Sequence, residues 1–120
     1  MLNQSNQTKV SAATRKTILF DTKLFFALSC KVSGTKGQLI KAGTPLKGDL
    51  TLRDTAFEVA GSSDTPVGIL EHDVIINEDG QANAGVLIFG FVDESKLDTN
   101  VVAKLDSAMK AKLPKITFCK

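Results

Sequence analysis

The chain lacks the residues from which many catalytic and nucleic-acid sites are built. It has no Trp and no Tyr, and His72 is its single histidine. A Ser–His–Asp triad or a multi-histidine metal site would have to be built around that one imidazole. The Phe side chains lie mainly in apolar runs and not among the basic residues, so base-stacking platforms are not expected. We therefore predict no catalytic residue, no cofactor, no metal and no nucleic-acid partner.

Long apolar runs are also missing, and cysteine is scarce. No run approaches the roughly 20 apolar residues needed to span a bilayer, so no membrane partner is expected. The first 16 residues, MLNQSNQTKVSAATRK, contain no apolar core of a signal peptide, which predicts synthesis in a reducing cytoplasm. In that compartment disulfides are rare, so we interpret Cys30 and Cys119 as small buried apolar residues.

What the chain does have is the composition of one ordinary folded domain. Its 120 residues are 42% hydrophobic and 23% charged, which is enough apolar material for a single core without a metal or a disulfide. We predict a flexible arm over residues 1–16 and one β-rich domain over residues 17–120. The expected fold class is α+β, mostly β, with one C-terminal amphipathic helix and a final short strand.

Charge is unevenly placed along the sequence although the net charge is only +2. Residues 1–42 carry seven Lys or Arg against one acid, residues 43–94 carry two against ten, and residues 95–120 carry six against two. Two interpretations remain open. Either the fold interleaves these segments and neutralises them locally, or the surface is two-signed and suited to docking onto copies of itself or onto a partner.

The first 16 residues read as an arm because they are polar, contain no aromatic residue and carry three bases without an acid. Alternate positions in this segment can form an added strand on an exposed sheet edge: Thr8, Val10, Ala12 and Thr14. The alternative is a frayed chain terminus.

Strict alternation over residues 23–33 predicts a half-buried strand, with one face formed by Leu24, Phe26, Leu28, Cys30 and Val32. The following SGTKGQ is typical of a turn, so Leu39 and Ile40 are expected to return as the second strand of a hairpin.

A second strand prediction rests on the run 86–92, which is apolar on both faces. Such a pattern indicates a strand buried on both sides, or one covered by a helix or by another subunit. Gly90 within it suggests the close approach of another backbone, or a bend. Before it, Asp79 and Gly80 give a turn signal that separates it from the segment 67–76.

The period becomes helical after residue 93. Leu97, Val101, Leu105 and Met109 recur at spacing four, which predicts an amphipathic helix over about residues 99–112. Asp98 or Thr99 can cap its start, Lys110 and Lys112 complement the dipole at its end, and Pro114 stops it. Residues 115–119 then form a short last strand with Ile116 and Phe118 on one face.

Three motifs that superficially suggest chemistry are better explained as structure. Glu71 and Asp73 are expected to point away from His72 on a strand, so a structural or surface role is favoured for this histidine. The glycines of GTPLKGD have phosphate-loop spacing, but Asp49 stands where the phosphate-binding lysine is required. The acids around Asp79 lack the later ligands of a calcium loop and are interpreted as a turn.

The order of several strings resembles the lambda-type head decoration proteins of tailed bacteriophages. The strings are KAGTPLKGD from Lys41, TPVGIL from Thr65, EHDV from Glu71, GQANAGVLIFGFVD from Gly80 and LPKITF from Leu113. The resemblance covers roughly residues 38–118. Each string alone is a common turn or strand, and it is their succession that is telling.

This resemblance implies a non-enzymatic capsid cement protein that is made in the host cytoplasm and located on the outer surface of the virion. It implies trimers that clamp the major capsid protein of an expanded head against the pressure of packaged DNA. The implied shell contact is the arm, and within it we choose Val10, Thr14 and Arg15 as the expected anchors. We place the turn formed by Gly43, Thr44, Pro45 and Gly48 near the trimer or capsid surface. The alternatives are a fibre-base or tail component, or a small ligand-binding or enzymatic domain that uses His72.

Overall fold

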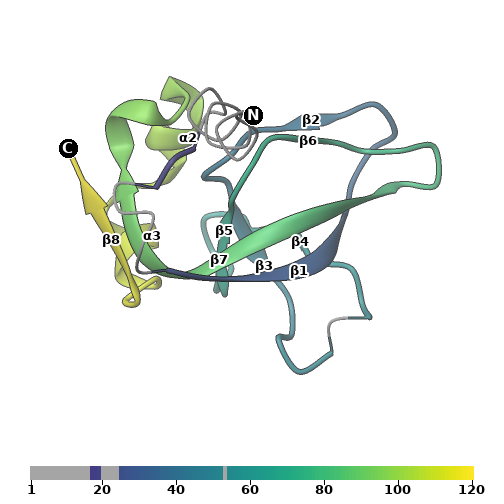
Figure 1. Ribbon diagram of the computed structural model, residues 1–120, viewed down its shortest axis with the longest axis horizontal. Coiled ribbons are helices and arrows are strands. Elements are labelled where there is room, and N and C mark those ends of the chain that lie inside the picture. The colour runs from purple at the N-terminus through teal and green to yellow at the C-terminus, as the bar shows by residue number, and fades with distance from the viewer. Residues whose placement is uncertain (1–16, 20–24, 53) are drawn as a thin grey trace, which may run out of the picture.

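The computed structural model describes residues 17–19, 25–52 and 54–120, and strands are its main regular elements (Figure 1). The strands are β1 (Phe26–Ser33), β2 (Leu39–Ile40), β3 (Pro45–Lys47), β4 (Glu58–Val59), β5 (Gly68–Leu70), β6 (Val74–Ile75), β7 (Gln81–Asp93) and β8 (Ile116–Cys119). A 3-10 helix, η1 (Glu94–Lys96), and two short helices, α2 (Thr99–Lys104) and α3 (Ser107–Ala111), lie between β7 and β8. The mostly β prediction is confirmed. The predicted flexible arm, 1–16, lies outside the described residues.

β7 is the hub of the main sheet, whose strand order is β1–β7–β5–β3–β4. Its 13 residues pair antiparallel with β1 and with β5, and its last four residues pair in parallel with β8. Val86, Leu87 and Val92 are completely buried in this strand. The predicted doubly apolar strand is therefore present, and its apolar residues place it in the middle of the sheet.

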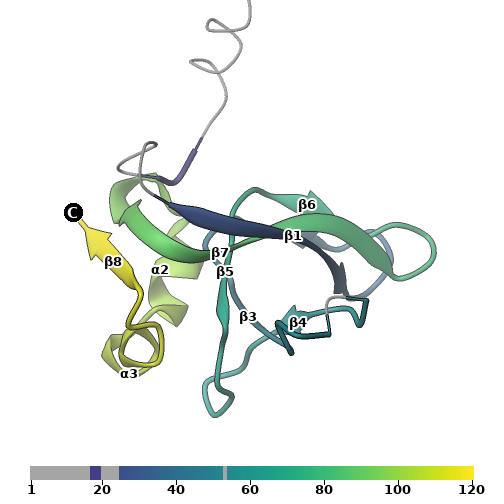
Figure 2. The same cartoon turned by 60° about the horizontal axis from the view of Figure 1, so that its bottom comes forward.

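The two ends of this sheet meet beside Phe57. Val32 of β1 forms a parallel bridge with Phe57, the residue that precedes β4. The amide of Ser33 donates to the carbonyl of Phe57 at 2.8 Å, and the amide of Phe57 donates to the carbonyl of Lys31 at 2.7 Å. Figure 2 shows β1, β7, β5, β3 and β4 arranged around a common interior. The sheet thus closes into a small barrel, and closure pairs backbone groups that an open edge would expose.

The barrel interior is one of two apolar clusters. We call it the barrel core, and it consists of Cys30, Val32, Ile40, Leu46, Phe57, Leu70, Ile76, Ala82 and Val86. The second cluster, the helical core, lies between the sheet and the helices and consists of Ile18, Leu19, Ile69, Leu87, Val92, Leu97, Val101, Leu105, Met109, Leu113 and Ile116. The predicted apolar helix face, with its spacing of four, is therefore confirmed as a buried face.

The prediction of one continuous helix is wrong. The chain leaves α2 at Leu105, and Asp106 is extended, with φ −75° and ψ 179°. The Asp106 side chain accepts a hydrogen bond from the Met109 amide at 2.9 Å and so caps α3 as a new helix. Asp98 caps α2 in the way expected, because its carboxylate accepts from the Asn100 amide. A second capping acid within the apolar periodicity therefore divides the helix without changing its buried face.

The predicted hairpin between residues 23–33 and Leu39–Ile40 is also wrong. β2 pairs antiparallel with β6 in a separate two-stranded sheet, with Leu39 opposite Ile75. The connecting turn is bound to the same region, because the amide of Gly34 donates to the Gly80 carbonyl and that of Gly37 to the Ile76 carbonyl. β7 already occupies the neighbouring position along β1, so the returning segment pairs elsewhere.

The face of β1 that was predicted to be buried is buried at only one end of the strand. Cys30 and Val32 are buried as predicted, whereas Phe26 is 53% exposed. The register with β7 shifts between Phe26, which lies opposite Phe89, and Ala27, which lies opposite Leu87. The extra residue of this bulge, Ile88, lies on β7, and at this end of β1 it is Ala27 that packs, against the helical core. The expectation for Phe26 is therefore wrong, and Leu24 lies outside the described residues.

Two glycines allow close approach to the hub strand. A Cβ on Gly68 would lie 2.5 Å from the carbonyl oxygen of Leu87, so β5 reaches β7 only because this side chain is absent. Gly90 has φ +154°, and a Cβ there would lie 3.1 Å from Cβ of Phe25. The expected neighbour of Gly90, another backbone, is not what lies there, because the nearest atoms belong to the side chains of Phe25, Leu87 and Leu19.

Candidate functional site

Only Pro45–Lys47 of the segment 43–48 form a strand, β3, and Gly43 lies in the turn before it, where the Thr44 amide donates to the Lys41 carbonyl at 3.3 Å. Gly43, Thr44 and Pro45 are buried, and Pro45 begins β3, which pairs with β5 and with β4. Gly43 has φ +93°, and a Cβ there would lie 2.7 Å from a methyl carbon of Leu97. The predicted turn is therefore present at Gly43, whereas Pro45 lies in a strand. Of the four residues singled out as surface candidates, only Gly48 is exposed.

The three arm candidates, Val10, Thr14 and Arg15, lie outside the described residues, so their role stays a prediction. The first residues that the structure describes, 17–19, already contact the sheet. Leu19 bridges Val92 in antiparallel fashion, and the amide of Asp93 donates to the carbonyl of Ile18 at 2.8 Å. Residues 18–19 therefore lie beside the last residues of β7, the part of the strand that also pairs with β8.

His72 lies in a bend between β5 and β6, and not on a strand. Its Nε2 is 3.8 Å from a carboxylate oxygen of Glu71, so the expectation that both acids point away from it is wrong. Asp73 is engaged elsewhere, because its carboxylate accepts from the Ala42 amide at 2.7 Å. Among the described residues, no group of three His, Cys, Asp or Glu side chains is placed to hold a metal ion.

The two cysteines lie against different parts of β7. Cys30 is buried opposite Ala84, as predicted, whereas Cys119 is half-buried opposite Asp93. These two positions on β7 are nine residues apart, which is roughly 30 Å of strand at about 3.3 Å per residue. A disulfide requires Cα atoms within about 7 Å, so the two cysteines of one chain are not placed to pair.

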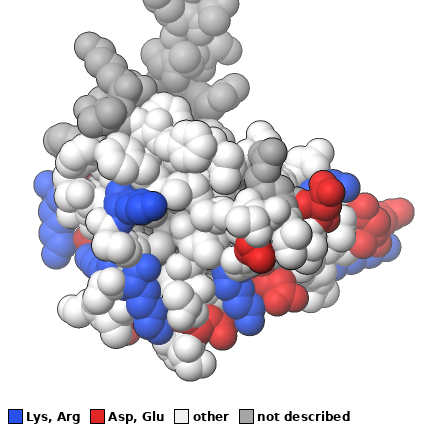
Figure 3. Space-filling model, turned by 90° about the horizontal axis from the view of Figure 1, so that it is seen from below, with Lys and Arg blue, Asp and Glu red and all other residues white. Residues whose placement is uncertain are grey.

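Ion pairs join segments of opposite charge, which supports the interleaved interpretation. Lys36 pairs with Glu78 at 3.7 Å, and Lys41 pairs with Asp73 at 3.9 Å. In the helical layer, Lys110 pairs with the buried carboxylate of Glu94. On the face shown in Figure 3, basic groups still predominate toward the end that carries α3 and β8, and acidic groups toward the opposite end. Local pairing and a two-ended surface are therefore both present.

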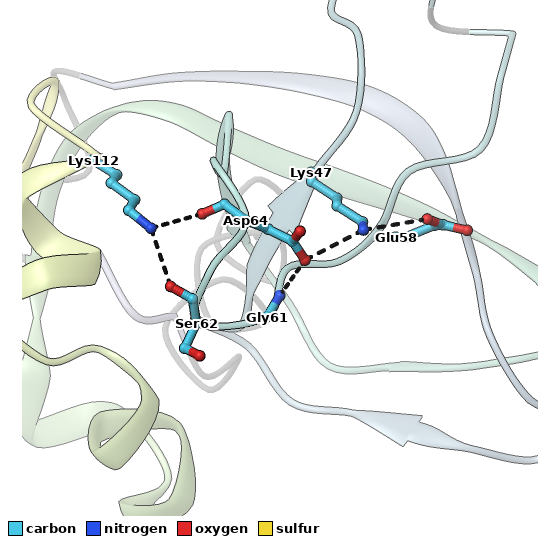
Figure 4. Close-up of polar contacts among 6 residues, drawn as sticks. All are labelled: Lys47, Glu58, Gly61, Ser62, Asp64 and Lys112. Carbon is cyan, nitrogen blue, oxygen red and sulfur yellow. Dashed lines mark hydrogen bonds and ion pairs between the residues drawn. The ribbon is translucent and has the colours of Figure 1, made fainter.

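A polar cluster around Asp64 ties the β4–β5 loop to the helical layer (Figure 4). The Asp64 carboxylate accepts from the Gly61 amide at 2.7 Å and pairs with Lys47 of β3 at 3.3 Å. Lys112, expected to complement the helix dipole, instead donates to the carbonyls of Ser62 at 3.1 Å and Asp64 at 2.9 Å. Local sequence patterns do not predict this link, because its partners are about 50 residues apart.

This cluster makes stability depend on pH. The hydrogen bond from the Gly61 amide, followed by that from Lys47, lowers the pKa of Asp64. A lowered pKa in the folded state means that the unfolded chain binds more protons in acid. The stabilisation is thus complete above the ordinary aspartate pKa, near 4, and is lost as pH falls through the lowered value.

We expect Asp64→Asn to flatten the fall of the urea midpoint below about pH 4, because asparagine accepts the same hydrogen bond but does not titrate. The urea midpoint, measured at several pH values from neutral to about pH 2.5, tests this expectation. Asp54→Asn is the matched control, since Asp54 is exposed and forms no hydrogen bond or ion pair with other described residues. An unchanged acid slope in Asp64→Asn would contradict the assignment.

Comparisons with known proteins add no relative. No protein-family model matches the chain, and no curated protein matches it either. In the described part of the chain, no helix is long and apolar enough to cross a membrane.

Proposed function

We propose that this protein is a non-enzymatic capsid decoration protein that binds the outside of an expanded phage head. The observation that carries the proposal is the succession of strings that resemble the lambda-type family, together with their places in the fold. KAGTPLKGD contains β3, TPVGIL contains β5, GQANAGVLIFGFVD contains β7 and LPKITF contains most of β8. These four strands are neighbours in one sheet, so the resemblance falls on one continuous structural unit.

The proposed partners are the major capsid protein and two further copies of the chain at each binding position. A small closed barrel suits this role, because closure protects most backbone edges from indiscriminate pairing before the protein reaches its shell. The proposed shell contact is the arm with Val10, Thr14 and Arg15. Gly48 remains the surface candidate on the domain itself. In this proposal the bound trimers oppose the internal pressure of packaged DNA.

Sedimentation with purified phage particles tests the function. We expect the protein to co-sediment with empty expanded heads, to saturate, and to remain in the supernatant with purified tails. Heads that carry the protein should also resist disruption by heat better than bare heads, because binding stabilises the assembled state. Binding to tails alone would favour the alternative of a fibre-base or tail component, and binding to neither would contradict a virion role.

A further inference from the structure

β8 leaves one side of the sheet open at the basic end of the molecule. Among the described residues it pairs only with β7, in parallel. Figures 1 and 2 both show it as the outermost strand, with no ribbon beyond its outer side. Barrel closure removes the open edge between β1 and the residue before β4, but it does not reach β8. This edge is therefore available to an added strand.

The register fixes which backbone groups face outward. Gly90 lies opposite Ile116, and its amide donates to the carbonyl of Lys115 at 3.2 Å. In a parallel ladder this bond directs both backbone groups of Thr117 toward β7. The amide of Phe118 and the carbonyls of Ile116 and Phe118 therefore point away from the sheet. These three groups, one hydrogen-bond donor and two acceptors, are spaced so that the backbone of an added extended chain can pair with them.

The charge beside this edge indicates what can bind there. Lys115 and Lys120 flank β8, are exposed, and form no ion pair with other described residues. Lys110 of α3 lies 5.3 Å from the centre of the Phe118 ring, but its charge is paired with Glu94, so the unpaired positive charge at this edge comes from Lys115 and Lys120. Lysine on an edge is also a device against self-pairing. In an antiparallel pair of two β8 strands, the flanking lysines of both copies would be brought close together, which is destabilising.

We propose that the outer edge of β8 binds an extended, acidic segment of a partner protein as an added strand. The segment accepts a hydrogen bond from the Phe118 amide and donates to the carbonyls of Ile116 and Phe118. Its carboxylates lie beside Lys115 and Lys120. A basic segment such as residues 1–16 has the wrong sign for this edge. The contact is distinct from the proposed arm contact and does not depend on it.

Short synthetic peptides test the edge directly. One peptide alternates Val and Thr between flanking glutamates, and its control carries lysines in place of the glutamates. We expect the acidic peptide to bind at least about tenfold more tightly than the basic one, and binding to weaken in about 0.5 M salt because exposed charges are screened. In the intact protein, the acidic peptide should slow hydrogen exchange of the Phe118 amide and leave that of Thr117 unchanged.

Two variants separate the backbone donor from the side chain. Phe118→Pro removes an amide that points outward, a position at which a strand tolerates proline. Phe118→Ala removes the ring and keeps the amide. We expect Phe118→Pro to bind the acidic peptide about tenfold less tightly than Phe118→Ala does, since an unpaired hydrogen-bonding group is costly. If Phe118→Pro fails to fold, the exchange measurement on the unaltered protein decides the question.

Three results would overturn the proposal. The first is the absence of binding by the intact protein, and the second is equal binding of the acidic and basic peptides. The third is self-association that disappears in Phe118→Pro, because it would assign the edge to a second copy of this chain. Selective protection of the Phe118 amide by the acidic peptide would support it.

Discussion

A variant that lacks residues 1–15 is expected to keep its folded domain and to lose binding to expanded heads. The fold should survive because the described contacts begin at Thr17, with Ile18 and Leu19 already bonded to the end of β7. Binding should fall by at least about tenfold, because the variant loses all three proposed anchors, Val10, Thr14 and Arg15. Thermal unfolding measures the first expectation, and sedimentation with heads measures the second.

A second arm variant tests whether binding depends on the order of the arm residues or only on their total charge. An arm of unchanged composition but shuffled order keeps Lys9, Arg15 and Lys16 in number, and loses the alternation of Thr8, Val10, Ala12 and Thr14. If an added strand forms the contact, the shuffled arm should bind nearly as poorly as the deletion. Full binding by the deletion variant would exclude the arm as the shell contact. Full binding by the shuffled variant alone would assign the contact to charge.

Phe57→Ala is expected to cost about 3–5 kcal/mol of the free energy of unfolding, the usual cost of truncating a buried Phe. Phe57 is 1% exposed and lies in the barrel core. A Cβ on Gly48 would lie 2.7 Å from its ring, so the side chain fills the space beside the end of β3. Its backbone also forms the two hydrogen bonds that close the barrel. The cavity would therefore lie at the seam between β1 and β4.

Leu52→Ala is the matched control for this prediction. Leu52 lies five residues before Phe57 and is 57% exposed, so its truncation should change stability by no more than about 0.5 kcal/mol. Urea unfolding measures both variants, with the unfolding slope reporting any change in the transition itself. A loss below about 1 kcal/mol in Phe57→Ala would show that the seam relaxes around the cavity.

Local periodicity predicted those parts of the fold that depend on one segment at a time. The apolar spacing of four places Leu97, Val101 and Leu105 in the helical core. In the doubly apolar run 86–92, Val86, Leu87 and Val92 are buried, whereas Phe89 is 38% exposed. Pairing partners were not predictable in this way. β2 pairs with β6 and not with β1 because β7 already lies beside β1, and that competition involves residues about 40 positions away.

The candidate site was predictable only in part for a similar reason. Glycine and proline in GTPLKGD indicate a turn when the segment is considered alone, but Pro45 lies at a strand end where a missing amide is tolerated. The burial of Thr44 depends on neighbouring strands that local composition does not specify. The Lys112 link to Ser62 and the Val32 bridge to Phe57 likewise arise only when distant segments meet.

Neighbouring side chains of β5 and of β7 belong to different apolar clusters, and this arrangement affects how the molecule unfolds. Val86 lies in the barrel core and the adjacent Leu87 in the helical core, and Leu70 and Ile69 are divided in the same way. Because neighbouring residues of two paired strands belong to different clusters, neither cluster can come apart without exposing part of the other. Mechanical load that reaches the chain at the helical end is therefore shared with the barrel, and the two clusters form one cooperative unit.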